Sequence, residues 1–575
     1  MKKYISGLLV IAAMASVACN PDLLNEPQKG VVDMDSFYKT PEDAESAVIT
    51  AYKAAKKCYD MGSAFDVSWC IAPPLFVLEN APSDDIYYGS GNKDDHVFGL
   101  EINEYRDSYT SNNTVVGNLY YGLYQMIYAC NLVTDHFQYG EDAVINRAVA
   151  EASCLRAFAH FKLYCLWGDA PLVDHVLVGS DKPGNTPRAE LLDWVISEFG
   201  TASKYLPSKS GLNDSELAIR FTKEAALAFK GKAEVFKGDY AAAKESLGAV
   251  IASGKYDLVP GAQMHDLFHM AGDGNMEKIF EFNYVNNPGN DPGFSDALDH
   301  FQVNQSCFWR DLYLPSNTIQ AVGWGGINPT KEFGDALIAN DGINSFRRKA
   351  WILTYDDLIL HMPYANDATM NTDAKKMADK SRGINAKTGV FGNAGYWSYK
   401  RVPLKSDLIA NHSYRTQENA VVMRYAEVLL LYAEACAWST DDAGKGLAAL
   451  KKVQQRAGSN HVSTALSKNE VKNEKRFELY LEGSRFFDLV RWGDAATVLA
   501  NNGKSVPTAY DKINDGGATH ELEIKWSSYN KTYGFKAGKN ENVPYPFAET
   551  SVNPNIVQNI GWYISVPLKS GRVKN

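Results

Sequence analysis

A chain of 575 residues with 45% hydrophobic residues is long enough to bury a sizeable core, as one very large domain or as several ordinary ones. Its formal net charge of −10 gives no electrostatic reason to expect nucleic acid or an anionic lipid surface as a partner. Aromatic residues make up 12% of the chain, more than a helical core usually needs, and this excess favours exposed stacking surfaces.

The N-terminus predicts an export signal. A basic start is followed by an apolar run from Ile5 to Ala13 and by small residues that lead to Cys19. These small residues resemble a bacterial lipobox, so we expect residues 1–18 to be a cleaved lipoprotein signal peptide and Cys19 to be lipidated. An ordinary secretory signal with a chance cysteine is the alternative. No later segment approaches ~18 continuous apolar residues, so we expect a lipidated N-terminus and spacer over 19–34 and then a soluble body.

Seven of the eight cysteines follow Cys19, an odd number that cannot all pair. No CxxC spacing is present for zinc or redox chemistry. Cys58 and Cys70 could form a single disulfide. The cysteines that fall inside apolar helical patterns are expected to be buried thiols: Cys130, Cys154, Cys165 and Cys436.

The first predicted helix lies within Asp35–Lys57. Thr40 is a candidate N-cap, Pro41 follows at the first helical position, and acidic residues occupy the first turn. Apolar residues then recur at helical spacing. Two further helical blocks are predicted over Val115–Val133 and Asn146–Trp167 by the same pattern.

The fourth helical block has the spacing of a tetratricopeptide helix pair. Small residues let two helices approach each other, and large residues fill the gaps between them. The residues at these intervals are Gly231, Gly238, Tyr240, Ala243 and Leu247. A looser counterpart runs from Met423 to Gly458, so we expect a helical scaffold with long insertions and not a regular array.

Three long insertions interrupt the helical blocks, at about residues 60–114, 256–327 and 353–416. Loops longer than ~15 residues are usually functional or disordered, and the aromatic residues in these segments argue against disorder. We therefore expect the binding function to reside in them.

Aromatic side chains of the insertions are the strongest candidates for ligand contact. Flat rings stack on the C–H faces of sugars, while Asp, Asn or Arg side chains bind the hydroxyls. The alternative is that each ring only packs its own loop onto the helical body. The predicted carbohydrate-binding residues are Trp69, Tyr87, Tyr88, Trp309 and Trp324, and the third insertion adds Tyr396 and Trp397.

Motifs for catalysis and cofactor binding are absent from the sequence. There is no GxSxG elbow, no GxxxxGK[ST] phosphate loop and no HExxH motif, so neither catalytic residues nor a cofactor are predicted. His265 and His269 are four residues apart but lack a glutamate base, so we expect a satisfied or solvated pair and no metal site. Sequence neighbours are not the opposed carboxylates that glycoside hydrolysis needs. This applies to Asp84/Asp85, Asp94/Asp95, Asp356/Asp357 and Asp441/Asp442.

The segment Glu474–Ala495, EKRFELYLEGSRFFDLVRWGDA, is dense in both charged and apolar residues. Such side chains could orient a substrate, or they could form ion pairs that let a charged helix be buried. On a helix, charges that alternate in sign every three residues could each meet an opposite neighbour. These charges are Glu482, Arg485, Asp488, Arg491 and Asp494. We interpret the segment as a structural clamp, and Gly483 within the expected helix indicates that another element comes close.

Five motifs in order resemble the SusD/RagB family of outer-membrane lipoproteins, over about Asp22 to Trp562. They are EASCLRAFAHFKLYCLWGDAPLV, KGDYAAAKESLGAVIASGKYDL, RYAEVLLLYAEA, FELYLEGSRFFDLVRWG and YPFAETSVNPNIVQNIGW. The resemblance implies a mainly α fold: one SusD-like domain over 35–575, built on four tetratricopeptide-like helix pairs with long irregular loop insertions and a few short strands.

The same resemblance implies a function. It implies a non-enzymatic, glycan-binding lipoprotein on the exterior of the outer membrane, which captures oligosaccharides for import through a SusC-like TonB-dependent transporter. A peptide-binding member of the same scaffold is the alternative, and a glycoside hydrolase with a helical toroid is a remote one. The ligand-contacting loops vary most within the family, so no binding residue is transferred by motif.

Overall fold

The computed structural model describes residues 37–59, 72–89, 91–212, 218–284, 325–360, 389–402, 404–408, 416–439, 441–514, 519–528 and 530–562. Cys19 and the segments 1–18 and 19–34 lie outside this part of the chain, so the signal peptide, the lipidation and the spacer stay predictions. No helix in the described ranges is both long enough and apolar enough to cross a membrane.

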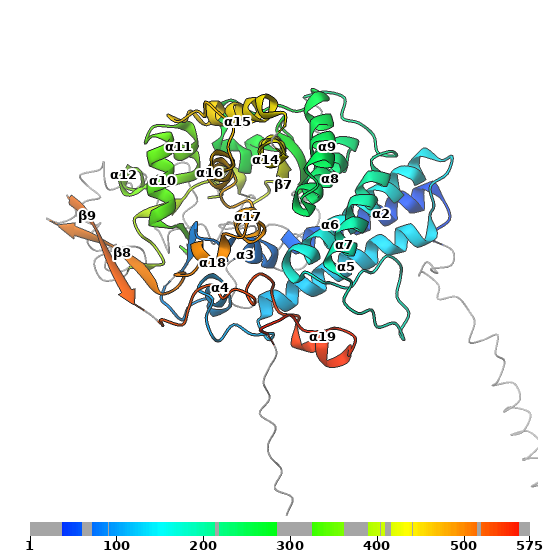
Figure 1. Ribbon diagram of the computed structural model, residues 1–575, viewed down its shortest axis with the longest axis horizontal. Helices are drawn as coiled ribbons and strands as arrows, with labels where there is room; N and C mark the ends of the chain where they lie inside the picture. Colours follow the sequence, from blue (N-terminus) through cyan, green and yellow to red (C-terminus); the bar gives the residue numbers. More distant parts are fainter. Residues whose placement is uncertain are drawn as a thin grey trace, which may run out of the picture.

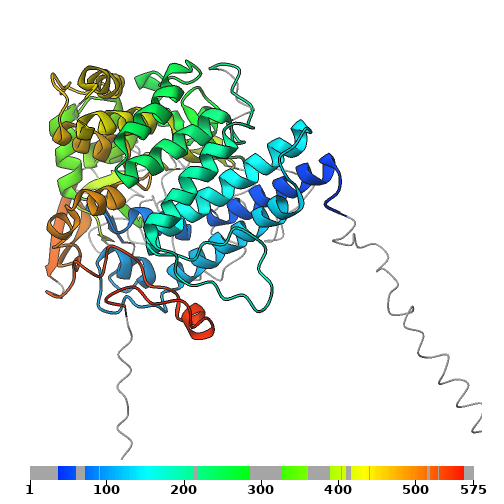
Figure 2. The same ribbon diagram turned by 45° about the vertical axis from the view of Figure 1, so that its right-hand side comes forward.

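Long helices form the main body of the molecule (Figure 1). They are α2 (Pro41–Lys56), α5 (Thr114–His136), α6 (Ala143–Trp167), α7 (Arg188–Ala202), α8 (Lys223–Lys237), α9 (Tyr240–Ala252), α14 (Tyr425–Ser439) and α15 (Ala443–Ala457). From α5 to α9 each helix packs against the next, α14 packs on both α9 and α15, and α2 lies against α5 and α6 (Figure 2). These contacts join the helices into one stack, and α14 and α15 belong to it although a long insertion precedes them.

The local signals for α2 act as the sequence predicts. The Thr40 hydroxyl accepts a hydrogen bond from the Asp43 amide at 3.1 Å, and the Asp43 carboxylate accepts one from the Thr40 amide at 2.9 Å. This reciprocal capping box satisfies two amides that a helix start otherwise leaves without partners. Pro41 occupies the first helical position, where its missing N–H costs nothing.

The small and large residues of α8 and α9 meet as predicted for a tetratricopeptide-like pair. A Cβ atom added to Gly231 would lie 2.5 Å from Cγ of Leu247, so the two helices approach too closely for any larger residue. Gly238 ends α8 with a φ of +82°, a left-handed conformation that glycine adopts without strain. The glycine pattern therefore determines both the separation of the pair and its turn.

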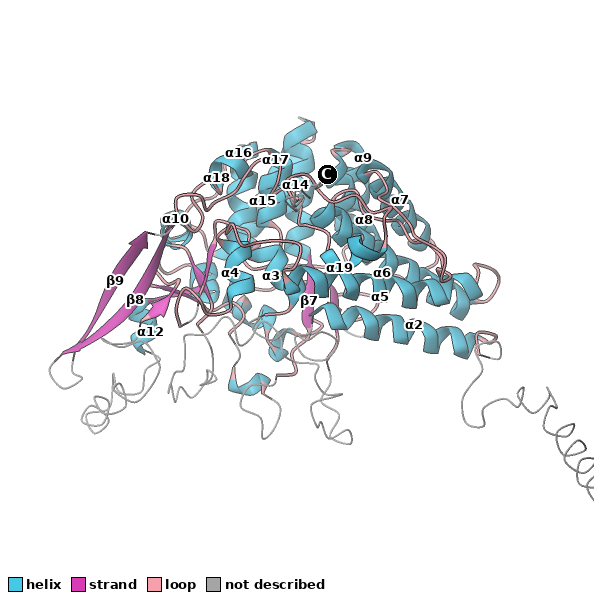
Figure 3. Cartoon of the chain, turned by 90° about the horizontal axis from the view of Figure 1, so that it is seen from below, coloured by secondary structure: helices cyan, strands magenta, loops and turns pink. Residues whose placement is uncertain are grey.

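Shorter helices and antiparallel strand pairs complete the described structure. The helices are α3 (Pro74–Asn80), α4 (Val97–Asn103), α10 (Lys331–Asp341), α11 (Phe346–Trp351), α12 (Tyr355–Leu360), α16 (Lys468–Glu478), α17 (Arg485–Trp492), α18 (Ala495–Val498) and α19 (Phe547–Val552). The strand pairs are β1 (Ile86–Tyr88) with β3 (Ile327–Pro329), β2 (Lys278–Phe282) with β7 (Ala420–Arg424), and β4 (Ile352–Thr354) with β6 (Tyr396–Ser398). A further sheet has β8 (Ser505–Asn514) between β5 (Val390–Phe391) and β9 (Thr519–Ser528). Figure 3 shows β8 and β9 at one end of the molecule, whereas α2, α5 and α6 extend toward the other end.

The charged C-terminal segment differs from the continuous helix that the sequence predicts. Helix α16 ends at Glu478, and α17 begins only at Arg485, because Leu481 and Gly483 adopt positive φ angles of 59° and 72° between them. The expected ladder of neighbouring charges is therefore wrong for most of its members, and only Asp488 and Arg491 pair within it, at 2.7 Å. Glu482 and Arg485 pair with distant parts of the chain, and Asp494 pairs with Lys472 in α16.

Gly483 does mark a close approach, as predicted, although it lies in a turn and not in a helix. A Cβ atom there would lie 2.7 Å from the carboxylate of Glu79 in α3, and the Gly483 amide donates to Asn80 Oδ1 at 2.9 Å. The turn between α16 and α17 is thus fixed against α3, the helix that precedes β1.

A buried ion-pair cluster connects α16 to its surroundings. Its members are Glu277, Asp341, Arg347, Lys400, Arg424, Arg456, Glu474, Glu478 and Glu482. Arg424 lies at its centre, with N–O distances of 2.7 Å to Glu277, 2.7 Å to Glu478 and 2.6 Å to Glu482. Burial opposes ionisation of Glu478, but Arg456, Arg424 and Arg347 outweigh it and hold the pKa of this carboxyl well below its usual range. This cluster supports the interpretation of the segment as a structural clamp.

The described cysteines and His269 are buried in the protein interior. The predicted buried thiols are confirmed, since each of Cys130, Cys154, Cys165 and Cys436 is a free, buried cysteine. Cys58 is also a free, buried cysteine, and Cys70 lies outside the described residues. His269 Nδ1 lies 2.7 Å from the Asp407 carboxylate, which explains its burial without a metal. Within the described ranges, no group of three or more His, Cys, Asp or Glu side chains could hold a metal ion.

Candidate functional site

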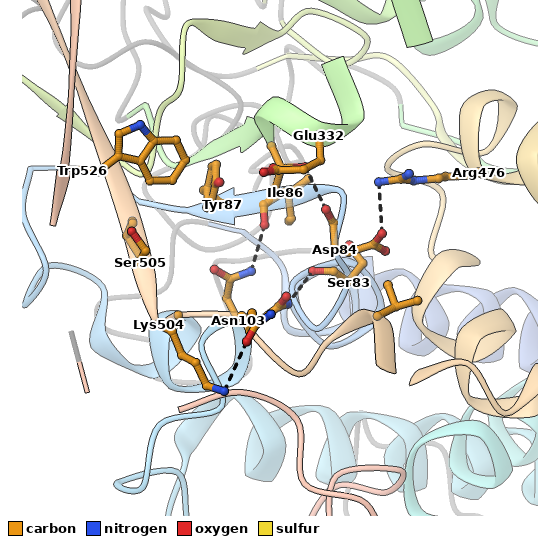
Figure 4. Close-up of a pocket in the computed structure, with 16 residues that line it drawn as sticks. Ser83, Asp84, Ile86, Tyr87, Asn103, Glu332, Arg476, Lys504, Ser505 and Trp526 are labelled. Atoms are coloured by element: carbon orange, nitrogen blue, oxygen red, sulfur yellow. Dashed lines mark hydrogen bonds and ion pairs between the residues drawn. The ribbon is translucent and has the colours of Figure 1, made fainter. Parts of the chain in front are cut away.

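A pocket of about 540 Å³ lies between β1, the loop that follows α18, and the β8–β9 hairpin (Figure 4). Its volume falls in the range of ~300–1,000 Å³ that is typical of small-molecule sites. The lining combines aromatic, amide, hydroxyl, charged and aliphatic groups. They are Tyr87 and Trp526; Asn103, Asn501 and Asn502; Ser83, Thr330 and Ser505; Asp84, Glu332, Arg476 and Lys504; and Ile86, Val498, Gly503 and Val506.

Two aromatic rings from distant parts of the chain meet at this pocket. The ring centroids of Tyr87 and Trp526 are 6.4 Å apart, and the ring planes are inclined at 75° to each other. Trp526 remains 47% exposed, which is unusual for a residue with so large an apolar side chain. The two rings therefore form an open corner with apolar faces that a ligand can contact (Figure 4).

Alternation along β1 explains why only one of its two tyrosines reaches the pocket. Tyr87 and Tyr88 point to opposite faces of the strand. Tyr88 is completely buried, and its ring packs so closely on Gly99 that a Cβ atom there would lie 2.2 Å from the ring. Tyr88 therefore has no exposed surface for a sugar, in contrast to the sequence prediction.

The other predicted aromatic residues divide into two groups. Trp69, Trp309 and Trp324 lie outside the described residues, so their role in binding stays a prediction. In the third insertion Trp397 is fully buried, and the Tyr396 hydroxyl donates to Asp335 at 2.7 Å. For these last two residues the packing alternative is the better description.

Trp526 is a residue that the sequence reasoning missed, although strand alternation gives a signal for it. Leu522, Ile524 and Trp526 share one face of β9, and the first two pack as partly buried residues against the core. Trp526 continues this apolar face beyond the core, where it meets the pocket instead of the body of the protein. An apolar residue at the end of a packed strand face is the pattern that could have identified it.

Amide side chains fix the loops around the rings. Asn103 Nδ2 donates to the carbonyl oxygens of Ala81 at 2.7 Å and Ile86 at 3.1 Å, while its Oδ1 accepts from the Tyr88 amide at 3.0 Å. Asn502 Nδ2 donates to the Ser83 carbonyl oxygen at 3.0 Å. These bonds preorganise the pocket and hold β1 in place, whereas Asn501 and Ser505 are exposed at its rim.

Asp84 and Arg476 line the inner wall of the pocket and form a group of ion pairs with Arg485 and Asp85, which do not line it. Arg485 donates from Nε and Nη2 to the two carboxylate oxygens of Asp84 at 2.8 and 3.0 Å. Arg476 lies 3.0 Å from Asp84 and donates to Asp85 at 2.6 Å. Both arginines belong to the clamp segment, so the clamp also positions the 83–85 loop of the pocket.

These pairs change the pKa values of the two aspartates in opposite directions. Burial opposes ionisation of Asp84, but Arg476 and Arg485 outweigh it and lower its pKa. Burial instead dominates at Asp85 and raises its pKa to about 6, despite the contact with Arg476. The doublet Asp84/Asp85 is thus part of an ion-pair group. The doublet Asp441/Asp442 is ion-paired too, since both of its carboxylates lie near Lys244.

Comparisons with known proteins identify the class of protein. The sequence profile described as the SusD family matches residues 235–562, more than half of the chain. A second profile, described as "Starch-binding associating with outer membrane", matches residues 84–233. The chain therefore belongs to the SusD family, as the motifs in its sequence predict.

Individual relatives are distant but match over most of their length. A SusD-like protein P38 of Formosa agariphila is 24% identical, over 87% of this chain and 94% of the relative. A SusD-like protein of Bacteroides ovatus is 23% identical, over 85% of this chain and 82% of the relative.

Solved structures confirm the fold. A laminarin binding SusD-like protein superposes with a TM-score of 0.67 at 22% identity, over 90% of this chain and 99% of the other. Surface glycan-binding protein A from Bacteroides thetaiotaomicron in complex with laminarihexaose gives a TM-score of 0.67 at 20% identity, with the same coverage. The mainly helical, SusD-like fold with a few short strands is thereby confirmed.

The family assignment also decides the question of catalysis. Glycan-binding proteins of the SusD family are not enzymes, so membership of this family confirms the prediction that this chain is not an enzyme. Association with the outer membrane belongs to the description of the second profile, and the chain falls in this outer-membrane-associated class.

Proposed function

We propose that this chain is a lipoprotein on the exterior of the outer membrane that captures oligosaccharides and delivers them to a SusC-like TonB-dependent transporter. The observation that supports glycan capture most strongly is the corner formed by Tyr87 and Trp526 beside a pocket of amide and hydroxyl groups. Membership of the SusD family supports it independently. The SusD-like structure named for laminarin binding and the one solved with laminarihexaose indicate glucans as the first ligands to test.

The geometry of the corner suits a sugar ring. A pyranose with equatorial hydroxyls has axial C–H groups on its faces and hydroxyls at its edges, so one face can stack on the indole of Trp526 while the edge hydroxyls meet polar groups. Tyr87 would then bound the ring from the side, because its plane is inclined at 75° to the indole. Such an open site buries little area, so we expect weak binding to each sugar unit.

Trp526→Ala is expected to lower the affinity for a bound neutral oligosaccharide by about tenfold or more, because removal of the indole deletes the larger stacking face. Isothermal titration with a panel of neutral oligosaccharides, laminarihexaose included, measures this change. Phe547→Ala is the matched control, since Phe547 is 51% exposed but does not line the pocket. Equal affinities for Trp526→Ala and the unmodified protein would show that the glycan binds elsewhere.

Anchoring and partnership are the second part of the proposal. A lipid on Cys19 would be separated from Phe37, the first described residue, by a spacer that can span at most ~3.6 Å per residue. Such a tether would keep the binding body near the membrane and near a transporter. We expect Cys19→Ala to shift the protein from the membrane fraction to the soluble fraction, and to abolish co-purification of a β-barrel transporter with the tagged chain. Retention of the variant in the membrane fraction would contradict the lipid anchor.

A further inference from the structure

Four charged residues line the pocket: Asp84 and Arg476 form an ion pair, and Glu332 and Lys504 add one charge of each sign. We propose that the pocket selects an uncharged glycan and discriminates against chains that carry uronate or sulfate groups. This inference rests on the proposed function and specifies the chemical class of its ligand. It depends on three features of the described residues: the inner wall, the rim and the rings.

Arg476, which lines the inner wall, and Arg485, which does not, both already bind carboxylates. Arg476 contacts Asp84 at 3.0 Å and Asp85 at 2.6 Å, and Arg485 binds Asp84 through both of its carboxylate oxygens. All four side chains are largely buried, and those of Asp84, Arg476 and Arg485 expose only 15%, 16% and 15% of their surface. An anionic ligand that approached Arg476 would have to compete with Asp84 and Asp85 for its positive charge, so it would gain less than from an unpaired cation.

The rim has one charge of each sign. Glu332 is exposed, and its charge adds to the effect of burial in raising the pKa of Tyr87. Lys504 is partly buried, and its Nζ donates to Asn501 Oδ1 at 3.3 Å. An anion stacked against Tyr87 would therefore be repelled by Glu332. Lys504 would attract it, but for an anion nearer to Glu332 than to Lys504 this attraction is the weaker of the two.

The uncharged surface of the pocket fits hydroxyl groups. Ser505 and Asn501 are exposed at the rim and can both donate and accept hydrogen bonds, as a sugar hydroxyl can. The ring faces of Tyr87 and Trp526 require only C–H groups opposite them. Recognition by these groups involves none of the ion pairs, whereas a carboxylate or sulfate bound at Arg476 would compete with Asp84 and Asp85. The paired wall therefore acts as a specificity filter.

A matched pair of ligands tests this inference. One is a neutral glucan hexaose, and the other is the same hexaose with one primary alcohol oxidised to a carboxylate. Isothermal titration of the mature protein at low salt is expected to give an affinity for the oxidised hexaose at least tenfold below that for the neutral one. Equal or tighter binding of the oxidised hexaose would overturn the inference while leaving glycan capture intact. Failure of both hexaoses and of a wider neutral panel to bind would overturn the proposed function and the inference together.

Two charge variants test the mechanism of the filter. Glu332→Gln removes an exposed carboxylate at the rim. Asp84→Asn removes the carboxylate that pairs with both Arg476 and Arg485, so the inner wall becomes more positive. Each is expected to narrow the affinity ratio between the two hexaoses by at least threefold, and thermal unfolding checks that Asp84→Asn remains folded. Glu141→Gln, at an exposed site that does not line the pocket, is the matched control. The charge filter would be overturned if Glu332→Gln left the affinity ratio between the two hexaoses unchanged and Asp84→Asn either did the same or failed to fold.

Discussion

Arg424→Ala is expected to destabilise the fold strongly. Arg424 is fully buried, and it binds Glu277, Glu478 and Glu482 at N–O distances of 2.6–2.7 Å. The substitution would leave these buried carboxylates with one fewer counter-charge and would open a cavity at the junction of β7 and α16. Removal of one partner from a buried ion pair costs about 3–5 kcal/mol, against a total stability of about 5–15 kcal/mol for a typical domain.

Urea unfolding followed by circular dichroism measures this loss of stability. Lys331→Ala is the matched control, because the ion pair of Lys331 with Asp335 is about half exposed and such pairs contribute only about 0–1 kcal/mol. We expect Arg424→Ala to be unfolded without urea or to have a greatly lowered midpoint, while the control unfolds like the unmodified protein. A well-folded Arg424→Ala protein with an unchanged midpoint would contradict the role of the cluster as a clamp.

The second large effect is expected from acid. Burial opposes ionisation of Glu434, but Arg491 and Lys475 outweigh it and lower its pKa to about 2, against an ordinary value of 4.5. The unfolded chain therefore binds more protons than the folded chain between these pH values, and stability is lost as the pH falls through this window. Glu478 and Glu482 also have lowered pKa values, and buried His160, whose pKa burial lowers to about 3, acts in the same direction below pH 6.5.

Urea midpoints measured from pH 6 down to pH 2.5 test this expectation, with a steep fall below pH 4.5 as the predicted result. Asp273→Asn is the control, because burial, together with the charge of Glu281, raises the pKa of Asp273 to about 7. A raised carboxyl pKa costs stability above pH 7 and is relieved in acid. The variant should therefore gain stability at pH 8 and show the same fall below pH 4.5. Midpoints that stay constant down to pH 2.5 would contradict the stabilising role of the glutamates.

Local signals in the sequence predict the helical scaffold well. A capping box needs only Thr40 and Asp43, and the close contact of Gly231 with Leu247 follows from the spacing of one helical hairpin. Local signals do not predict the partners of the clamp charges, because Arg485 pairs with Asp84 at a separation of 401 residues. Periodicity describes neighbours on one helix, so it predicted a continuous ladder and missed the turn that Leu481 and Gly483 form.

The candidate site could be predicted only in part for the same reason. Tyr87 was identified from its aromatic, polar insertion, but the same reasoning could not distinguish it from Tyr88 without the register of β1 with β3. Trp526 lies outside the three predicted insertions, and its proximity to Tyr87 depends on how the β8–β9 hairpin packs on the body. Burial and long-range packing, which no local pattern contains, decide which rings remain available to a ligand.

A crystal structure of the mature protein with a bound neutral oligosaccharide tests the central proposal most directly. We predict electron density for a sugar ring stacked on the indole of Trp526 and bounded by Tyr87, with its hydroxyls within hydrogen-bonding distance of rim groups such as Asn501 and Ser505. Density for the oligosaccharide at another surface, with the pocket between Tyr87 and Trp526 empty, would contradict it.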